Sequence, residues 1–179
     1  MTAAESAIAH AGHSPETTRE RLVTWQDPVP VAATGAAMTG IDYLDAISSG
    51  ELPPPPIAVL MRFHPAEVEP GRAVFEGEPG EEHYNPIGTV HGGYAATLLD
   101  SALGSAVHTT LPAGVGYTTL TLEVKMVRPI TRDIERVRVE AEVLHRGRKQ
   151  ATAQARLTDA ATGKLLAHGT STCLILGDG

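Results

Sequence analysis

Three segments in the second half of the chain alternate apolar and polar residues, at 118–127, 136–143 and 151–157, and an apolar run at 165–176 follows them. A period of two is typical of an antiparallel sheet with one covered face. The residues predicted to face the core are Leu120, Leu122, Val124 and Met126, then Val137, Val139, Ala141 and Val143, then Ala151, Ala153, Ala155 and Leu157.

Two shorter strands are predicted within residues 62–79, on either side of the turn Glu69-Pro70-Gly71. Residues 145–148 and 159–163 have the composition of hairpin turns between the later strands. The chain therefore predicts a sheet of about six strands.

A different pattern, apolar on nearly every face, occupies residues 92–108 and ends near Leu111-Pro112-Ala113-Gly114. A helix that is hydrophobic all round is a buried helix. The sheet needs a cover for its apolar face and this helix needs burial, and a curved sheet wrapped around the helix satisfies both. We therefore predict an α+β fold with a long central hydrophobic helix.

Asp100 is the one acidic residue in this helix. A buried carboxylate is costly unless it is paired or hydrogen-bonded. No Lys or Arg occurs between Arg72 and Lys125, and no residue one turn away can form a salt bridge with it. Asp100 therefore either forms a hydrogen bond or ion pair with a residue distant in sequence, or it takes part in catalysis.

Residues 1–54 precede this pattern and are predicted to form an N-terminal extension, with the folded domain at 55–179. Residues 1–36 show no clear period and read as a mobile or loosely packed segment. One short helix is predicted after Thr39, ended by Gly50, and the prolines at 53–56 form a stiff linker.

Composition indicates a globular protein, with 42% hydrophobic and 20% charged residues in a chain of 179. No apolar stretch reaches the length of a membrane span, and residues 1–21 lack the pattern of a signal peptide. Cys173 is the single cysteine, which excludes an internal disulfide. It could be a nucleophile, but its place in a strand favours a small buried hydrophobe. We expect a cytoplasmic protein that does not enter the membrane.

The net charge of −7 argues against a nucleic-acid partner, and its distribution is uneven. Residues 1–124 hold 15 acidic and 4 basic side chains, whereas residues 125–179 hold 6 acidic and 10 basic ones. The basic segment indicates either a local anionic ligand or solvated strand faces.

The sequence NPIGTVHGG at 85–93, followed by LLD at 98–100, resembles the signature of PaaI-type acyl-CoA thioesterases. Residues 119–129 are similar to the strand after the helix in that family, and 145–148 and 163–175 to its closing hairpins. The resemblance covers about residues 55–176. It implies the hotdog fold and hydrolysis of an acyl-CoA thioester to a carboxylic acid and coenzyme A. The sequence indicates no metal and no redox cofactor, and coenzyme A is counted as part of the substrate.

In that family a backbone N–H at the start of the helix binds the thioester carbonyl oxygen, a role that the resemblance gives to Gly92, with Gly93 beside it. A helix N-terminus is suited to an oxyanion, although a glycine pair often forms only a tight turn. The loop asparagine corresponds to Asn85, which is otherwise a turn former. His91 could be a base or a ligand, but the absence of a second ligand at metal spacing favours a loop-organising role.

The family's helix acid, which acts as nucleophile or as base for water, corresponds to Asp100. A hydroxyl on the next strand corresponds to Thr118 or to Thr119. Counting back from Pro129 favours Thr119, whereas counting forward from Asp100 favours Thr118. Since adjacent strand residues face opposite sides of a sheet, only one of the two can lie beside the acid.

Gly92 and Asp100 are eight residues apart, which is about 12 Å along a helix. One thioester carbon cannot contact both in the same chain. The two groups of one site should therefore come from two chains related by a twofold axis, as a homodimer. The resemblance implies the same composite dimer, often paired again into a tetramer.

Four basic residues are candidates for the coenzyme A phosphates, although solvated hairpin charges are equally expected: Arg128, Arg146, Arg148 and Lys149. Two rival functions stay open. A non-catalytic acyl-CoA-binding protein would keep the fold without turnover. A hotdog hydratase or dehydratase would need a His and an acid at one site, and no matching motif is present.

Overall fold

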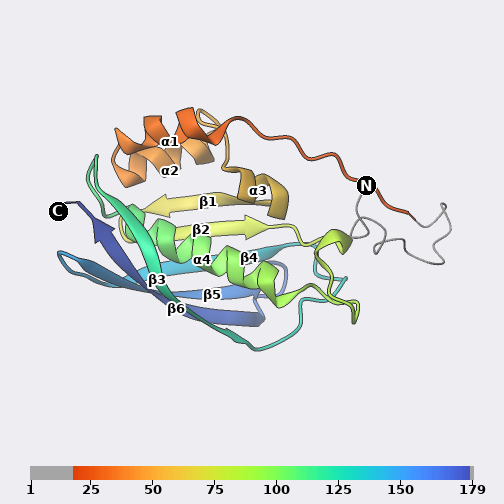
Figure 1. The fold of residues 1–179 in the computed structure, drawn as a ribbon. Coiled ribbons are helices and arrows are strands. Elements are labelled where there is room, and N and C mark those ends of the chain that lie inside the picture. The colour runs from red at the N-terminus through yellow and green to blue at the C-terminus, as the bar shows by residue number, and fades with distance from the viewer. Residues whose placement is uncertain (1–17, 178–179) are drawn as a thin grey trace, which may run out of the picture.

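The computed structural model describes residues 18–177, which contain one six-stranded antiparallel sheet in the order β1-β2-β4-β5-β6-β3. The sheet curves around helix α4, as Figure 1 shows. The predicted α+β fold is confirmed, with six strands and a central helix. The elements of the domain are β1 (Phe63–Glu69), β2 (Arg72–Gly77), a 3-10 turn η2 (Glu81–His83), α4 (Gly92–His108), β3 (Gly116–Met126), β4 (Val137–Arg146), β5 (Gln150–Asp159) and β6 (Leu165–Leu176).

Helix α4 has the predicted length and forms the centre of the core, where it packs against β2, β4 and β5. Leu98, Leu99 and Leu103 are completely buried there. The prediction that the helix is covered on every side is wrong for a single chain. Gly93 is exposed, and Gly92, Thr97 and Asp100 are only partly buried. This uncovered face consists of small and polar residues, and the strongly apolar ones turn toward the sheet.

The strands β4 and β5 bury the residues that the alternation assigned to the core, except that Val143 is half-buried. Cys173 on β6 is buried, in agreement with its interpretation as a small hydrophobe. The last strands of the sheet therefore follow the sequence pattern closely.

The prediction of a covered apolar face fails for β3, which is an edge strand and pairs with β6 alone among the described strands. Leu120 is 50%, Leu122 37% and Met126 52% exposed, and only Val124 packs partly against the core. A bulge between Thr119 and Thr121 shifts the register, so the alternation does not continue along one face. The single chain thus has an open strand edge with uncovered apolar side chains.

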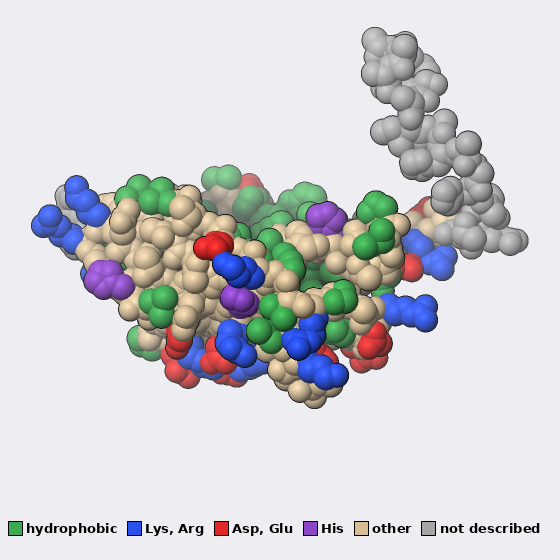
Figure 2. All heavy atoms as spheres, turned by 90° about the horizontal axis from the view of Figure 1, so that it is seen from below, with side chains coloured by type: hydrophobic (Ala, Val, Ile, Leu, Met, Phe, Trp, Pro, Cys, Tyr) green, Lys and Arg blue, Asp and Glu red, His purple; other side chains and the backbone are tan. Residues whose placement is uncertain are grey.

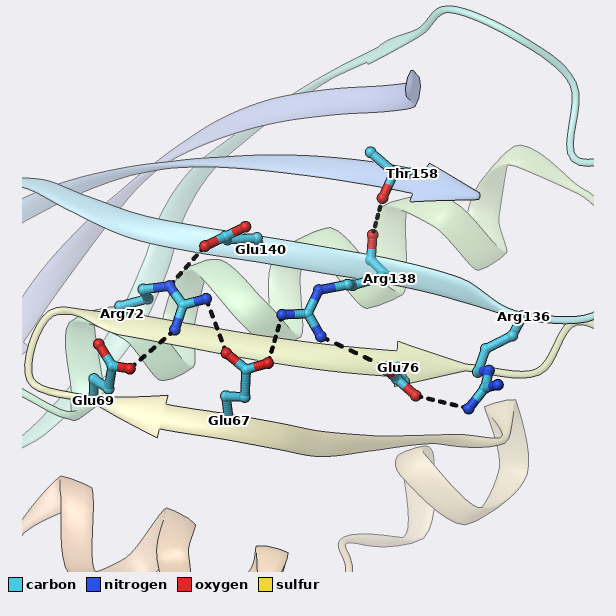
Figure 3. Close-up of polar contacts among 8 residues, drawn as sticks. All are labelled: Glu67, Glu69, Arg72, Glu76, Arg136, Arg138, Glu140 and Thr158. Carbon is cyan, nitrogen blue, oxygen red and sulfur yellow. Dashed lines mark hydrogen bonds and ion pairs between the residues drawn. The ribbon is translucent and has the colours of Figure 1, made fainter. Parts of the chain in front are cut away.

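The outer face of β1, β2 and β4 carries a network of ion pairs, shown in Figure 3. Arg72 contacts carboxylates on both neighbouring strands, and Arg138 bridges two acids from the N-terminal half of the chain. The members are Glu67, Glu69, Arg72, Glu76, Arg136, Arg138 and Glu140. Part of the charge asymmetry of the sequence therefore reflects solvated strand faces, because two of the basic residues pair with acids of β1 and β2.

Within the described residues, three helices precede the sheet where the sequence predicted one: α1 (Pro28–Ala36), α2 (Gly40–Ser48) and α3 (Pro56–Met61). The helix after Thr39 is confirmed as α2, and the Thr39 side chain caps it. The sequence missed α1 because its two prolines suggest irregular chain, yet Pro28 occupies the first turn and Asp27 caps it. The predicted loose packing of residues 1–17 lies outside the described residues.

Helix α2 packs on β1 and α4, whereas α1 is exposed along most of its length and buries only Gly35. The Gly40 amide donates to the Leu111 carbonyl oxygen at 3.1 Å. A Cβ at Gly40 would lie only 1.8 Å from the carbonyl oxygen of His108, so only glycine permits this approach. The start of α2 is thus fixed against the end of α4.

Candidate active site

The N-terminus of α4 is organised by His91, which is the cap of the helix. Its Nδ1 accepts a hydrogen bond from the Gly93 amide at 2.8 Å, and its carbonyl oxygen accepts one from Tyr94 at 2.9 Å. The His91 amide in turn donates to the His83 carbonyl oxygen at 2.8 Å. These contacts give His91 the loop-organising role that the sequence favoured, and they occupy the Gly93 amide.

The amide of Gly92 is different, because its N–H donates no hydrogen bond to any group within residues 18–177. Gly92 lines a pocket of about 310 Å³ together with Val90, Ala95, Met126 and Arg128. A Cβ at this position would lie 3.2 Å from the Met126 Cε, inside that space. This free N–H at the positive end of the helix can therefore donate a hydrogen bond to a carbonyl oxygen of a molecule bound in the pocket.

Asp100 lies two turns further along α4 and is half-buried. Thr119 on β3 donates a hydrogen bond from its Oγ1 to the Asp100 Oδ1 at 3.1 Å. Thr119 is half-buried, whereas Thr118 is exposed. The structure thus resolves the choice between the two threonines in favour of Thr119 as the partner of the acid.

The charge of Asp100 is not neutralised within the described part of the chain. No Lys, Arg or His nitrogen there lies within 4.0 Å of it, and its second oxygen accepts no hydrogen bond. Among the same residues no group of three His, Cys, Asp or Glu side chains is placed to hold a metal ion. Asp100 is therefore a carboxylate with one oriented oxygen and one available oxygen.

Asn85 forms the loop that leads into α4. Its Oδ1 accepts hydrogen bonds from the amides of Ile87 at 3.1 Å and Thr89 at 3.2 Å, and its Nδ2 donates to the Thr89 hydroxyl at 3.0 Å. All three contacts stay inside residues 85–89. In a single chain Asn85 thus fixes the conformation of the loop that precedes Gly92.

The structure separates the four basic residues that the sequence grouped for phosphate binding. Arg128 lines the pocket beside Gly92 and donates to the Leu165 carbonyl oxygen at 2.7 Å. Arg146, Arg148 and Lys149 belong to the β4–β5 hairpin. This hairpin lies at the far end of the sheet from the start of α4, and Figure 2 shows basic side chains gathered at that end. The single chain does not bring the two groups together.

Sequence reasoning missed a second set of polar residues on α4. Among the polar residues of this helix, only Asp100 was singled out from the sequence. Ser101, Ser105 and His108 follow one another at helical spacing and line one pocket. Their spacing of four and three residues was the available signal.

Comparison with known proteins agrees with this geometry. The sequence model of the thioesterase superfamily matches residues 87–165. Human acyl-coenzyme A thioesterase 13 is 34% identical over 114 residues, which are 64% of this chain and 80% of that protein. A phenylacetic acid degradation-related protein from Ralstonia eutropha JMP134 superposes with a TM-score of 0.67 at 28% identity, covering 74% of this chain and 98% of its own. A mutant of the phenylacetic acid degradation protein PaaI from Thermus thermophilus superposes with a TM-score of 0.60 at 29% identity, covering 67% and 98%.

A curved sheet around a central helix, with a free amide at the helix start and a carboxylate two turns along, defines a hotdog thioesterase. The chain belongs to the thioesterase superfamily, as a PaaI-type member. None of the helices within residues 18–177 combines the length and apolar character needed to span a bilayer.

Proposed function

We propose that the protein is an acyl-CoA thioesterase, which hydrolyses its substrate to a carboxylic acid and coenzyme A. The observation that carries the proposal is the pair of uncommitted groups on one helix, the Gly92 amide and the Asp100 carboxylate oriented by Thr119. The name of the human relative, acyl-coenzyme A thioesterase 13, supports the same activity.

The chemistry follows from these groups. The Gly92 N–H donates to the thioester carbonyl oxygen and stabilises the negative charge that develops on it. Asp100 promotes attack on the carbonyl carbon, either by taking a proton from water or by attacking that carbon itself. The carbon–sulfur bond then breaks, and the thiolate of coenzyme A leaves and is protonated. In the second route water hydrolyses the acyl-enzyme anhydride.

The two groups of one site come from two chains in this proposal. Eight residues of helix separate them by about 12 Å, which is too far for one carbonyl group to contact both. The open edge of β3 and the uncovered face of α4, which contains Asp100, are available for a second copy. A twofold axis between two such helices places each Gly92 beside the Asp100 of the other chain.

This dimer also gives the basic hairpin a role. Two α4 helices related by that axis run in opposite directions. The end of the second copy that lies opposite the start of its own α4 therefore extends past Gly92 of the first copy. The hairpin with Arg146, Arg148 and Lys149 lies at that far end (Figure 1). No acidic side chain among the described residues pairs with these three or with Arg128. They are therefore available for the coenzyme A phosphates.

A panel of acyl-CoA thioesters assayed for release of free thiol tests the proposal. The wild-type protein should release thiol from at least one of them, and Asp100→Asn should lower kcat by about 100-fold or more because the amide has neither the basicity nor the nucleophilicity of a carboxylate. Binding of acyl-CoA without thiol release would instead indicate a non-catalytic binding protein. Addition of water to an enoyl-CoA without thiol release would indicate a hydratase. Retention by Asp100→Asn of more than about a tenth of the wild-type rate would exclude the role given to Asp100.

A further inference from the structure

A second pocket lies between the N-terminal helices and the domain. It has a volume of about 200 Å³ and is lined by α2, α3, β1 and β2 on one side and by α4 and β3 on the other. Residues Leu44, Ile47 and Ile57 contribute apolar walls from α2 and α3. The match to the thioesterase superfamily covers residues 87–165, so the helices that close this pocket lie outside the matched region.

The pocket adjoins the candidate catalytic pair. Ser101, which lines it, follows Asp100 directly on α4. Tyr117, which also lines it, precedes Thr119 by two residues on β3. The alternation of the strand therefore points Tyr117 and Thr119 to the same side. A substrate carbonyl held at Asp100 has this space next to it.

Aromatic side chains are concentrated around the pocket. The whole chain has two Phe, four Tyr and one Trp. Four of these seven line the pocket, namely Tyr43, Phe63, Phe75 and Tyr117. The ring centroids of Phe63 and Phe75 lie 6.0 Å apart, and the His108 ring makes an edge contact with Tyr43 at 5.9 Å and a tilted contact with Tyr117 at 5.4 Å. Such a wall suits a compact apolar group.

No Asp, Glu, Lys or Arg side chain of the described residues lines the pocket. Burial lowers the pKa of His108 and raises that of Tyr117. Ser101 and Ser105 add only hydroxyl groups from the same face of α4. The Tyr117 hydroxyl lies over Gly104, where a Cβ would be 2.6 Å away, so the glycine makes room for this ring. A pocket with apolar walls and neutral polar groups does not attract a charged acyl group.

We propose that the N-terminal segment 40–61 forms the far wall of the acyl-binding pocket and thereby limits the size of the acyl group. This proposal rests on the proposed thioesterase function. A cavity of about 150 Å³ holds one benzene molecule. The pocket of about 200 Å³ therefore takes a compact, uncharged acyl group, either one ring or an aliphatic chain of similar volume, and excludes long fatty acyl chains.

Ile47→Phe tests the far wall by filling the pocket from α2. The matched control is Ile41→Phe, which makes the same change on the same helix at a half-buried position that does not line the pocket. The measurement is kcat/KM for acetyl-, octanoyl-, phenylacetyl- and palmitoyl-CoA. The wild type should prefer octanoyl- or phenylacetyl-CoA over palmitoyl-CoA, and the comparison of these two substrates distinguishes a chain from a ring.

Ile47→Phe should lower the ratio of kcat/KM for the preferred substrate to that for acetyl-CoA by about tenfold or more, since one methylene in a pocket already has an effect of that size. Ile47→Ala shortens the side chain and enlarges the pocket, so it should shift the preference toward longer acyl chains. This variant tests the same wall if Ile47→Phe does not fold. Ile41→Phe should keep the wild-type ratio. An unchanged ratio in both Ile47 variants, or efficient wild-type turnover of palmitoyl-CoA, would overturn the proposal. Absence of wild-type turnover on the whole panel would instead refute the thioesterase function.

Discussion

Thr119 on β3 donates a hydrogen bond to Asp100 on α4 at 3.1 Å, across 19 residues of sequence. This contact shows how the one acid of an apolar helix is satisfied. It holds one carboxylate oxygen and leaves the other available, so it orients the group without neutralising its charge.

Loss of this bond should reduce turnover more than substrate binding. We expect Thr119→Ala to lower kcat by about tenfold or more, because a hydrogen bond to a charged group contributes about 1.5–3 kcal/mol. Thr119→Ser should retain most of the rate. Thr118→Ala removes the same groups from the neighbouring position and is the control. Equal losses in Thr118→Ala and Thr119→Ala would show that the bond to Asp100 has no special part in turnover.

The contact of α2 with the end of α4 can be tested at Gly40. Gly40→Ala places a Cβ 1.8 Å from the His108 carbonyl oxygen, and the backbone must move to admit it. We expect a loss of stability of about 1–3 kcal/mol in denaturant unfolding, as is usual for overpacking. Gly116→Ala is the control, since a Cβ there meets no atom within 4 Å. A wild-type midpoint for Gly40→Ala would show that the N-terminal helices are not held by this contact.

His83 should make stability depend on pH. It is buried beside the Tyr94 ring, and its Nδ1 accepts a hydrogen bond from the Gly80 amide at 2.9 Å. Burial lowers its pKa, with Arg21 and Arg62 acting in the same direction and Glu82 opposing them. Because the folded pKa lies below the unfolded value of about 6.5, the unfolded chain binds more protons between the two values. Stability should be constant above that value and fall as the pH decreases below it.

The measurement for this residue is the thermal midpoint between pH 8 and pH 5. His83→Gln keeps an acceptor for the Gly80 amide and should flatten the acid side of the profile. His145→Gln, which replaces an exposed histidine, is the control and should show the same pH profile as the wild type. A His83→Gln profile as steep as that of the wild type would assign the acid sensitivity to other groups, of which His108 is the next candidate because burial also lowers its pKa.

The basic hairpin should affect binding of the nucleotide part of the substrate. Replacing Arg146, Arg148 and Lys149 together by Gln should raise KM for acyl-CoA by about tenfold with little change in kcat, because the phosphates lie far from the reacting carbon. The same variant should keep its KM for an acyl-pantetheine thioester, which lacks those phosphates. Equal effects on both substrates would indicate a structural role for the hairpin.

Much of the fold was readable from the sequence, because the period of two on β4 and β5 and the apolar run of α4 reflect burial within one chain. The same reasoning failed for Leu120, Leu122 and Met126, whose apolar side chains lie on an uncovered edge. A hydrophobic pattern shows which residues avoid water, and it does not show whether the cover comes from the same chain. The prolines of α1 misled for another reason, since Pro28 occupies the first turn of a helix, where proline is tolerated.

The candidate site was only partly accessible to sequence reasoning. Asp100 and Gly92 stand out through local rules on buried charge and helix ends. The choice between Thr118 and Thr119 depends on strand register and on the bulge after Thr119, which no local pattern reports. The pocket closed by α2 and α3 depends on packing between segments far apart in sequence, so Ser101, Ser105 and His108 gained meaning only from the structure.

Mixing two inactive variants tests the composite site most directly. Asp100→Asn removes the carboxylate, and Gly92→Val places a branched side chain toward the pocket and the Met126 methyl group. If each site takes Gly92 from one chain and Asp100 from the other, a mixed dimer has one doubly altered site and one intact site. Mixing should then restore thiol release, up to about half the rate of a wild-type dimer for each heterodimer. Heterodimers confirmed by native mass spectrometry that show no recovered turnover would contradict the account.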